Sequence, residues 1–86
     1  MPPVTIYTTS LCGYCHAAKR LLKHKAVDFK EIDVGGRPDL REEIRTKSGG
    51  RTTVPQIWIG ETHVGGCDDL YALEDSGKLD EMLHGA

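Results

Sequence analysis

The hydrophobic and polar positions of the chain alternate between two periods, and each change of period marks an expected element. A short β-branched and aromatic run at residues 4–8, Val-Thr-Ile-Tyr-Thr, predicts a buried strand. From Cys12 onward the apolar positions recur every three or four residues, which predicts a helix. Its expected apolar stripe is formed by Tyr14, Ala17, Ala18, Leu21 and Leu22. Residues 27–34 return to strand-like alternation and predict a second strand.

Glycines and a proline divide the next part of the chain into a helix and a hairpin. Pro38 suits the first turn of a helix, and the pair Gly49-Gly50 ends that helix. Residues 54–59 predict a third strand. A tight turn at Gly60-Glu61 leads into a fourth strand at 62–64, so these two strands are expected to form a hairpin.

Two helices complete the expected order of elements. Asp68 and Asp69 favour a helix start, Gly77 ends this helix, and apolar residues at 79–83 predict a short C-terminal helix. The order β-α-β-α-β-β-α predicts an α/β fold. Its first strands form a parallel pair joined by a right-handed crossover, and the hairpin adds an antiparallel edge. We therefore expect a four-stranded mixed sheet with helices on both faces.

Length and charge narrow the class of protein. With 86 residues, the chain is expected to form a single domain over residues 1–86. Its net charge of −2 argues against a general nucleic-acid or membrane binder, which is usually basic. No apolar run approaches the roughly 20 residues needed to span a bilayer, and the start lacks a basic and then apolar signal segment. These features predict a cytoplasmic protein, which we expect to be a monomer.

The cysteines supply the candidate chemistry. Cys12 and Cys15 are two of only three cysteines, an arrangement typical of redox or metal sites in a reducing compartment. Cys12 is expected at a helix N-terminus, where free N–H groups and the helix dipole favour the thiolate that attacks disulfides. Cys15 lies three residues later on nearly the same face. We therefore predict that Cys12 is the nucleophile and Cys15 the less exposed resolving thiol.

Zinc binding is the first alternative for this pair. Zinc normally requires four cysteine or histidine ligands, and His63 and Cys67 are the residues that could complete a site with Cys12 and Cys15. Neither has the spacing of a zinc knuckle, and the cysteine pair opens a helix after a strand. This context favours redox chemistry over metal binding.

Three separated motifs resemble the glutaredoxins. They are Cys12-Gly13-Tyr14-Cys15, Thr53-Val54-Pro55 and Gly65-Gly66-Cys67-Asp68-Asp69, and the resemblance extends from Val4 to about Leu83. It is strongest to the small bacterial dithiol members of the glutaredoxin 3 type. The resemblance implies a thioredoxin fold and glutathione-dependent reduction of protein disulfides and of glutathionylated proteins. Glutathione itself is the implied co-substrate.

The resemblance also implies a glutathione site. Its members would be Tyr14, Arg51, Thr53, Val54, Pro55, Gly66, Cys67, Asp68 and Asp69. In this family a cis peptide bond precedes the proline, and the Val54 backbone pairs with the cysteine part of glutathione. The segment 65–69 would receive the γ-glutamyl end, and Asp68 or Asp69 would face its ammonium group. Arg51, with Arg37 as second candidate, would bind the glycyl carboxylate.

The remaining cysteine and the histidines have plainer expectations. Cys67 is expected to be a small buried hydrophobic residue, which is compatible with a backbone contact to glutathione. The four histidines share no spacing that indicates catalysis. We expect them at the surface.

Two departures from the family pattern leave alternatives open. Many relatives have proline at the position of Gly13. Glycine or serine there is associated with members that hold a 2Fe–2S cluster between two subunits, so a glutathione-ligated cluster on Cys12 is the main alternative. Close relatives often carry lysine near Thr9, and Lys19 and Arg20 are the cations that could compensate at longer range. A thioredoxin served by a reductase is disfavoured by the residues between the cysteines and by the segment 66–69.

Overall fold

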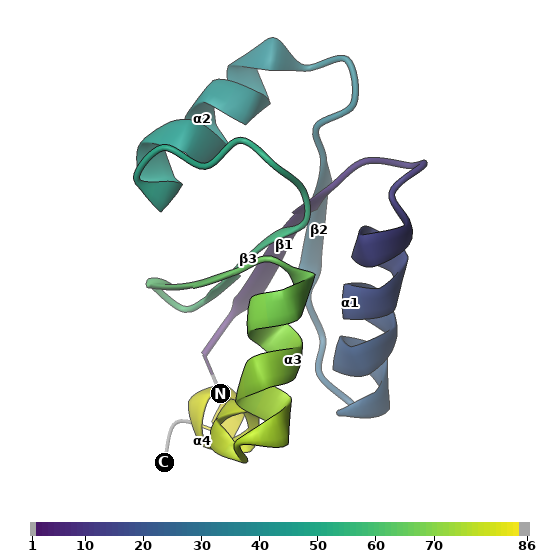
Figure 1. Cartoon of the computed structure of the whole chain (residues 1–86), viewed down its shortest axis with the longest axis vertical. Helices are drawn as coiled ribbons and strands as arrows, with labels where there is room; N and C mark the ends of the chain where they lie inside the picture. Colours follow the sequence, from purple (N-terminus) through teal and green to yellow (C-terminus); the bar gives the residue numbers. More distant parts are fainter. Residues whose placement is uncertain (1, 85–86) are drawn as a thin grey trace.

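The computed structural model describes residues 2–84 and contains one four-stranded sheet with four helices (Figure 1). The strands follow the spatial order β2-β1-β3-β4. β1 pairs in parallel with β2, whereas the β1–β3 and β3–β4 pairs are antiparallel. The elements are β1 (Val4–Thr8), α1 (Gly13–His24), β2 (Lys30–Asp33), α2 (Pro38–Ser48), β3 (Gln56–Ile59), β4 (Thr62–Gly65), α3 (Cys67–Asp75) and α4 (Lys78–His84). The expected order of elements and the mixed sheet are confirmed.

Two strands are shorter than the sequence pattern predicted. The expected strand at 27–34 is reduced to β2, because the chain leaves α1 through a turn in which Val27 N–H donates to Leu22 O (3.2 Å). The expected strand at 54–59 begins only at Gln56, since Pro55 has no N–H to donate to a ladder. The Val54-Pro55 peptide bond is cis, as the resemblance implied.

The sheet separates two apolar clusters of unequal size. Successive side chains of a strand point to opposite faces, so Ile6 packs on one face and Tyr7 on the other. The larger cluster includes buried residues of α1, α3 and α4. The smaller one lies under α2 and consists of Tyr7, Val34, Ile44 and Trp58. Helices therefore cover both faces, as predicted.

Tyr14 does not belong to the buried stripe of α1. The buried positions of this helix are Cys15, Ala18, Leu21 and Leu22, whereas Tyr14 is 67% exposed. The prediction was wrong here because helical spacing alone does not say how far the first turn extends beyond the body of the fold. Between residues 2 and 84, no helix is long and apolar enough to cross a bilayer.

Candidate active site

Cys12 occupies the N-cap position of α1, where the sequence placed it. Its Sγ atom accepts a hydrogen bond from the Cys15 N–H (3.1 Å) and lies 3.7 Å from the Val54 carbonyl oxygen, to which the thiol can donate. The N–H groups of a first helical turn have no partner within the helix, so the sulfur satisfies one of them. Cys12 is partly exposed and is not in a disulfide. This is the setting in which a thiolate is stabilised and can still be reached.

Cys15 has the opposite environment. Its side chain is fully buried, and burial, with the side-chain hydrogen bond to Cys12 as the next cause, raises the pKa of the Cys15 thiol to about 12. Cys15 is therefore a protonated thiol at neutral pH, close to a sulfur that is exposed. This difference fits the assigned order of attack, in which Cys12 acts first.

Glu31 partly neutralises the positive charge of Lys19, so Lys19 acts on the thiols less than the sequence suggested. Its ammonium group lies 2.9 Å from Glu31, which also accepts a hydrogen bond from the buried hydroxyl of Thr8 (2.8 Å). These two bonds hold the pKa of Glu31 below its usual range, so the carboxylate stays charged beside Lys19. Lys19 still lowers the pKa of Cys15, but only as a minor cause.

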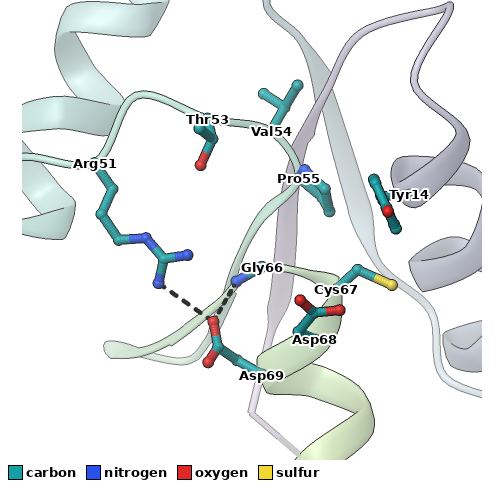
Figure 2. Close-up of a pocket in the computed structure, with 9 residues that line it drawn as sticks. All are labelled: Tyr14, Arg51, Thr53, Val54, Pro55, Gly66, Cys67, Asp68 and Asp69. Carbon is teal, nitrogen blue, oxygen red and sulfur yellow. Dashed lines mark hydrogen bonds and ion pairs between the residues drawn. The ribbon is translucent and has the colours of Figure 1, made fainter.

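All nine residues expected to contact glutathione line one pocket (Figure 2). Its volume is about 280 Å³, close to the roughly 300 Å³ at which small-ligand pockets begin. Tyr14 forms one side of the pocket, and Arg51 lies at the opposite side (Figure 2). The structure thus brings together side chains from α1, from the segment before β3 and from the start of α3.

One carboxylate organises the charged side of the pocket. The Asp69 Oδ2 atom accepts from the Gly66 N–H (2.9 Å) and lies 3.2 Å from the Arg51 Nη1 atom (Figure 2). The Gly66 N–H bond, with Arg51 as a further cause, holds the pKa of Asp69 below its usual range. Arg51 and Asp69 were expected to bind opposite ends of a ligand, but they also pair directly with each other. Their ion pair leaves the second Asp69 oxygen and other guanidinium N–H groups for a ligand.

The last residue of β4 must be glycine. Gly65 has a φ of 116°, and a Cβ atom there would overlap the Asp69 carboxylate and lie 2.9 Å from Arg51 Nη1. A Cβ atom at Gly66 would lie 3.4 Å from the Pro55 carbonyl oxygen. Absence of side chains at these two positions lets the start of α3 approach the loop that carries Arg51.

Two further candidates, Cys67 and Arg37, differ in whether they line the pocket. Cys67 is buried (8% exposed) in the larger core while it also lines the pocket, and burial followed by the Asp68 charge raises the pKa of its thiol. Arg37 does not line the pocket and instead forms a two-bond ion pair with Asp39 (3.1 and 2.9 Å). Arg51 is therefore the cation that the structure places at this site.

A partly buried hydrogen-bond chain that reaches the pocket at Thr53 was not predicted from sequence. The fully buried Gln56 donates from Nε2 to Thr53 Oγ1 (3.1 Å), and its Oε1 atom lies 2.7 Å from His63 Nε2. The expectation of a surface histidine was wrong for His63, whose ring also stacks on Trp58 with centroids 4.6 Å apart. Partial burial, with the charge of Arg51 as a further cause, lowers the pKa of His63, so its ring is neutral at pH 7.

Within residues 2–84, no three cysteine, histidine or acidic side chains converge on a point that could hold a metal ion. The zinc ligand set considered from sequence is thus not assembled. What the geometry offers instead is a partly exposed sulfur at a helix start, a buried second thiol, and an adjacent pocket with both charge signs. This combination suits thiol exchange with a small zwitterionic ligand.

Comparisons with known proteins agree with this chemistry. The family model described as Glutaredoxin matches residues 4–64. A glutaredoxin of Pseudomonas aeruginosa is 66% identical and aligns over 96% of this chain and 98% of its own length. Glutaredoxin 3 of Escherichia coli K12 is 54% identical over 96% of this chain and 99% of its own length.

Solved structures of the same kind superpose closely. The solution structure of glutaredoxin from Brucella melitensis is 58% identical, with a TM-score of 0.85 over 96% of this chain and 89% of the other. The buckwheat glutaredoxin–glutathione complex is 29% identical, with a TM-score of 0.89 over 98% and 78%. The holo form of glutaredoxin C1 from Populus tremula × tremuloides is 29% identical, with a TM-score of 0.88 over 98% and 78%.

Proposed function

Because this chain belongs to the glutaredoxin family of glutathione-dependent thiol–disulfide oxidoreductases, we propose that Cys12 is its nucleophile and Cys15 its resolving thiol. Its mixed sheet with helices on both faces is the thioredoxin fold. The observation that carries the assignment is the contact of 3.1 Å between Cys12 Sγ and the Cys15 N–H at the start of α1. This contact stabilises negative charge on Cys12 both before attack and when it is released as leaving group.

With a glutathionylated protein, one cysteine is enough. The Cys12 thiolate attacks the glutathione sulfur, a Cys12–glutathione disulfide forms, and the protein thiolate leaves and takes up a proton. A second glutathione, as thiolate, then attacks the glutathione sulfur of this mixed disulfide. Glutathione disulfide leaves, and Cys12 returns to the thiolate.

With a protein disulfide, Cys15 completes the reaction. Attack by Cys12 gives a mixed disulfide with the substrate and releases the other substrate thiolate. Cys15 then loses its proton to solvent and attacks the Cys12 sulfur, which releases the second substrate thiolate and leaves a Cys12–Cys15 disulfide. The released thiolates take up protons from solvent. In the mixed disulfide Cys12 carries no charge, so one cause of the raised pKa of Cys15 is removed at the step that needs its thiolate. Two glutathiones then reduce the Cys12–Cys15 disulfide.

The pocket is proposed to bind the glutathione part of the mixed disulfide. Arg51 would contact a carboxylate of the tripeptide, and the backbone of Val54 would pair with its cysteine residue. Asp68 and Asp69 lie in the first turn of α3, where a carboxylate oxygen can receive the ammonium group. The buckwheat glutaredoxin of similar fold, whose structure is a complex with glutathione, supports this assignment.

The assignment is tested with single-cysteine variants and two substrates. We expect Cys12→Ser to lose more than about 1000-fold in kcat/KM with a glutathionylated peptide. Cys15→Ser should keep activity on that peptide and lose activity on a protein disulfide. The measurement is glutathione-dependent turnover, coupled to the removal of glutathione disulfide.

The two substrates serve as controls for each other. Because Cys15→Ser must remain active on the glutathionylated peptide, its failure on a protein disulfide cannot be blamed on misfolding. Retention of activity by Cys12→Ser with either substrate would remove Cys12 from the role of nucleophile.

A 2Fe–2S cluster shared by two copies is the second candidate, supported by a fit and by a relative. A Cβ atom on Gly13 would have no neighbour within 4 Å, and Cys12 Sγ is partly exposed, so space exists beside the sulfur. A distant relative of 29% identity has been solved in a holo form. Cys12 of each copy and a glutathione thiolate would be the ligands, and the bound cluster would supply electron storage or transfer to another protein.

Anaerobic purification with glutathione tests this candidate. Cluster binding predicts a brown dimer that loses colour and dissociates when glutathione is removed, and Cys12→Ser should give a colourless monomer. A wild-type protein that stays colourless and monomeric under these conditions contradicts it.

A further inference from the structure

Gln56 is a buried polar side chain whose position has no role in the exchange steps. It is fully buried on β3, on the sheet face that carries Tyr7 and Trp58. A buried amide must find hydrogen-bond partners, because leaving them unmade costs the full desolvation penalty. Its two partners are Thr53, which lines the pocket, and His63 on β4. Gln56 therefore connects the pocket to a histidine behind it.

The three side chains form a chain with a direction. With the Gln56 amide oriented so that Nε2 faces Thr53, its Oε1 atom lies 2.7 Å from His63 Nε2 and can only accept. In this arrangement His63 Nε2 carries the imidazole proton. Gln56 Nε2 in turn donates to Thr53 Oγ1 (3.1 Å). A hydroxyl that accepts from one side keeps its own proton for another acceptor. Thr53 is thereby left with an O–H group to donate elsewhere.

The free direction of Thr53 is toward the pocket. In Figure 2, the Thr53 oxygen and the Arg51 guanidinium group extend from the same loop toward Gly66 and Asp69, whereas the Val54 side chain points away. If the Gln56 amide were reversed, Thr53 would donate inward and present only lone pairs to the pocket. Lone pairs would repel an anionic ligand, whereas an O–H group would bind it.

We propose that Gln56 and His63 are positioning residues that fix the Thr53 hydroxyl as a hydrogen-bond donor to a ligand carboxylate in the pocket. This inference rests on the proposed function, because the carboxylate is one of those of glutathione. Arg51 already shares its guanidinium with Asp69 (3.2 Å), so a second, neutral donor next to it adds to recognition of the carboxylate. Neither Gln56 nor His63 touches the ligand.

The first test is a double-mutant cycle with a glutathionylated peptide as substrate. Thr53→Val removes a hydrogen bond to a charged group and should raise KM about 10-fold with little change in kcat. Thr53→Ser keeps the hydroxyl and should have the wild-type KM. Gln56→Met keeps the approximate volume but removes both bonds, and it should raise KM about 3- to 10-fold. His63→Phe, which keeps a ring on Trp58, should move KM in the same direction.

The decisive comparison is the double variant Thr53→Val/Gln56→Met. If Gln56 acts only by directing the Thr53 hydroxyl, the double variant has the same KM as Thr53→Val alone. Effects that multiply, or an unchanged KM in Gln56→Met, would overturn the proposal. A purely structural role of Gln56 lowers kcat and thermal stability together and does not depend on whether Thr53 carries a hydroxyl.

A second test needs no variant and remains informative if Gln56→Met does not fold. The ¹⁵N chemical shifts of the His63 ring in the wild-type protein at pH 7.5 distinguish its two neutral tautomers. The proposal requires the proton on Nε2, and a proton on Nδ1 contradicts it.

Different results contradict the proposed function and the role given to Gln56. A wild-type protein that does not reduce the glutathionylated peptide contradicts the proposed function. A fully active wild-type protein whose KM is insensitive to Thr53→Val contradicts only the role given to Thr53, Gln56 and His63.

Discussion

The three cysteine thiols of this protein lie in different surroundings. Cys12 is partly exposed and hydrogen-bonded at a helix start, whereas Cys15, one helical turn further, is sealed in the core. Cys67 is also buried, and burial raises the pKa of its thiol. This difference in burial supports the proposed order of the exchange steps, in which Cys12 reacts first.

The buried thiol of Cys15 predicts a dependence of stability on pH in the reduced protein. Its pKa is about 12 in the fold against an ordinary value of 9.0. Above pH 9 the unfolded chain therefore binds fewer protons than the folded one, and the free energy of unfolding decreases as pH rises. The contribution of this group is about 1.4 kcal/mol per pH unit at most, between pH 9 and about 12. It is fully retained below pH 9.

Urea unfolding at pH 7 and pH 10, with a reductant present, measures this effect. Cys15→Ala is the matched control, because it removes this one thiol and leaves Cys12 and Cys67 in place. The wild-type protein should lose more stability between the two pH values than the variant does. Equal losses would show that the Cys15 proton is not held more tightly in the fold.

Residue positions could be predicted from sequence where they depend on local structure. The N-cap position of Cys12 follows from a strand, a short loop and a helix in succession, all visible in the pattern of apolar residues. By contrast, the pairing of Arg51 with Asp69 depends on how distant segments meet, and the contact of Gln56 with His63 depends on the shifted register between β3 and β4. No periodicity records such contacts. His63 was consequently expected at the surface.

At the scale of elements, the junction of β4 and α3 brings the Gly65 backbone close to Asp69 and Arg51. Gly65→Ala should destabilise the fold by about 1–3 kcal/mol, because alanine is strained at a φ of 116° and its methyl group would overlap the Asp69 carboxylate. Displacement of that carboxylate breaks its bonds to Gly66 and Arg51. We therefore also expect a higher KM for a glutathionylated peptide. Thermal unfolding and steady-state kinetics measure the two effects.

Gly13→Ala is the control for stability. The Gly13 φ does not lie in the left-handed region, and a Cβ atom there meets nothing within 4 Å. Its free energy of unfolding should stay within about 0.5 kcal/mol of wild type. If Gly65→Ala were as stable as Gly13→Ala, the close approach of α3 to Arg51 would not depend on glycine.

Element order could be predicted from sequence more completely than element boundaries. The glycine pairs and Pro38 mark helix ends because their backbone preferences are local. Strand ends depend on partners: Val27 is apolar and buried, yet its N–H bonds to the end of α1 and not to β1. The strand predicted from the alternating pattern was therefore longer than β2, the part that pairs with β1.

For the whole molecule, the sheet divides the interior into a large core and a small one. Of the described residues, twelve are buried in the cluster shared by α1, α3 and α4, and four in the cluster under α2. Helices on both faces of the sheet were expected from the alternation of strands and helices along the chain. The unequal size of the two clusters was not expected, because it depends on which face of the sheet each strand side chain occupies. The described chain is 35 Å long and 20 to 23 Å across.

The two sides of the pocket pack on different apolar clusters. Gly66 and Asp69 belong to the start of α3, on the large core, whereas Arg51 and Thr53 lie just after α2, which rests on the small one. A transient opening of α2 would loosen the hold on a ligand and leave the sealed thiol of Cys15 undisturbed. Affinity for a ligand of the pocket and burial of the Cys15 sulfur thus depend on different parts of the fold. Substitutions beneath α2 can alter the first without altering the second.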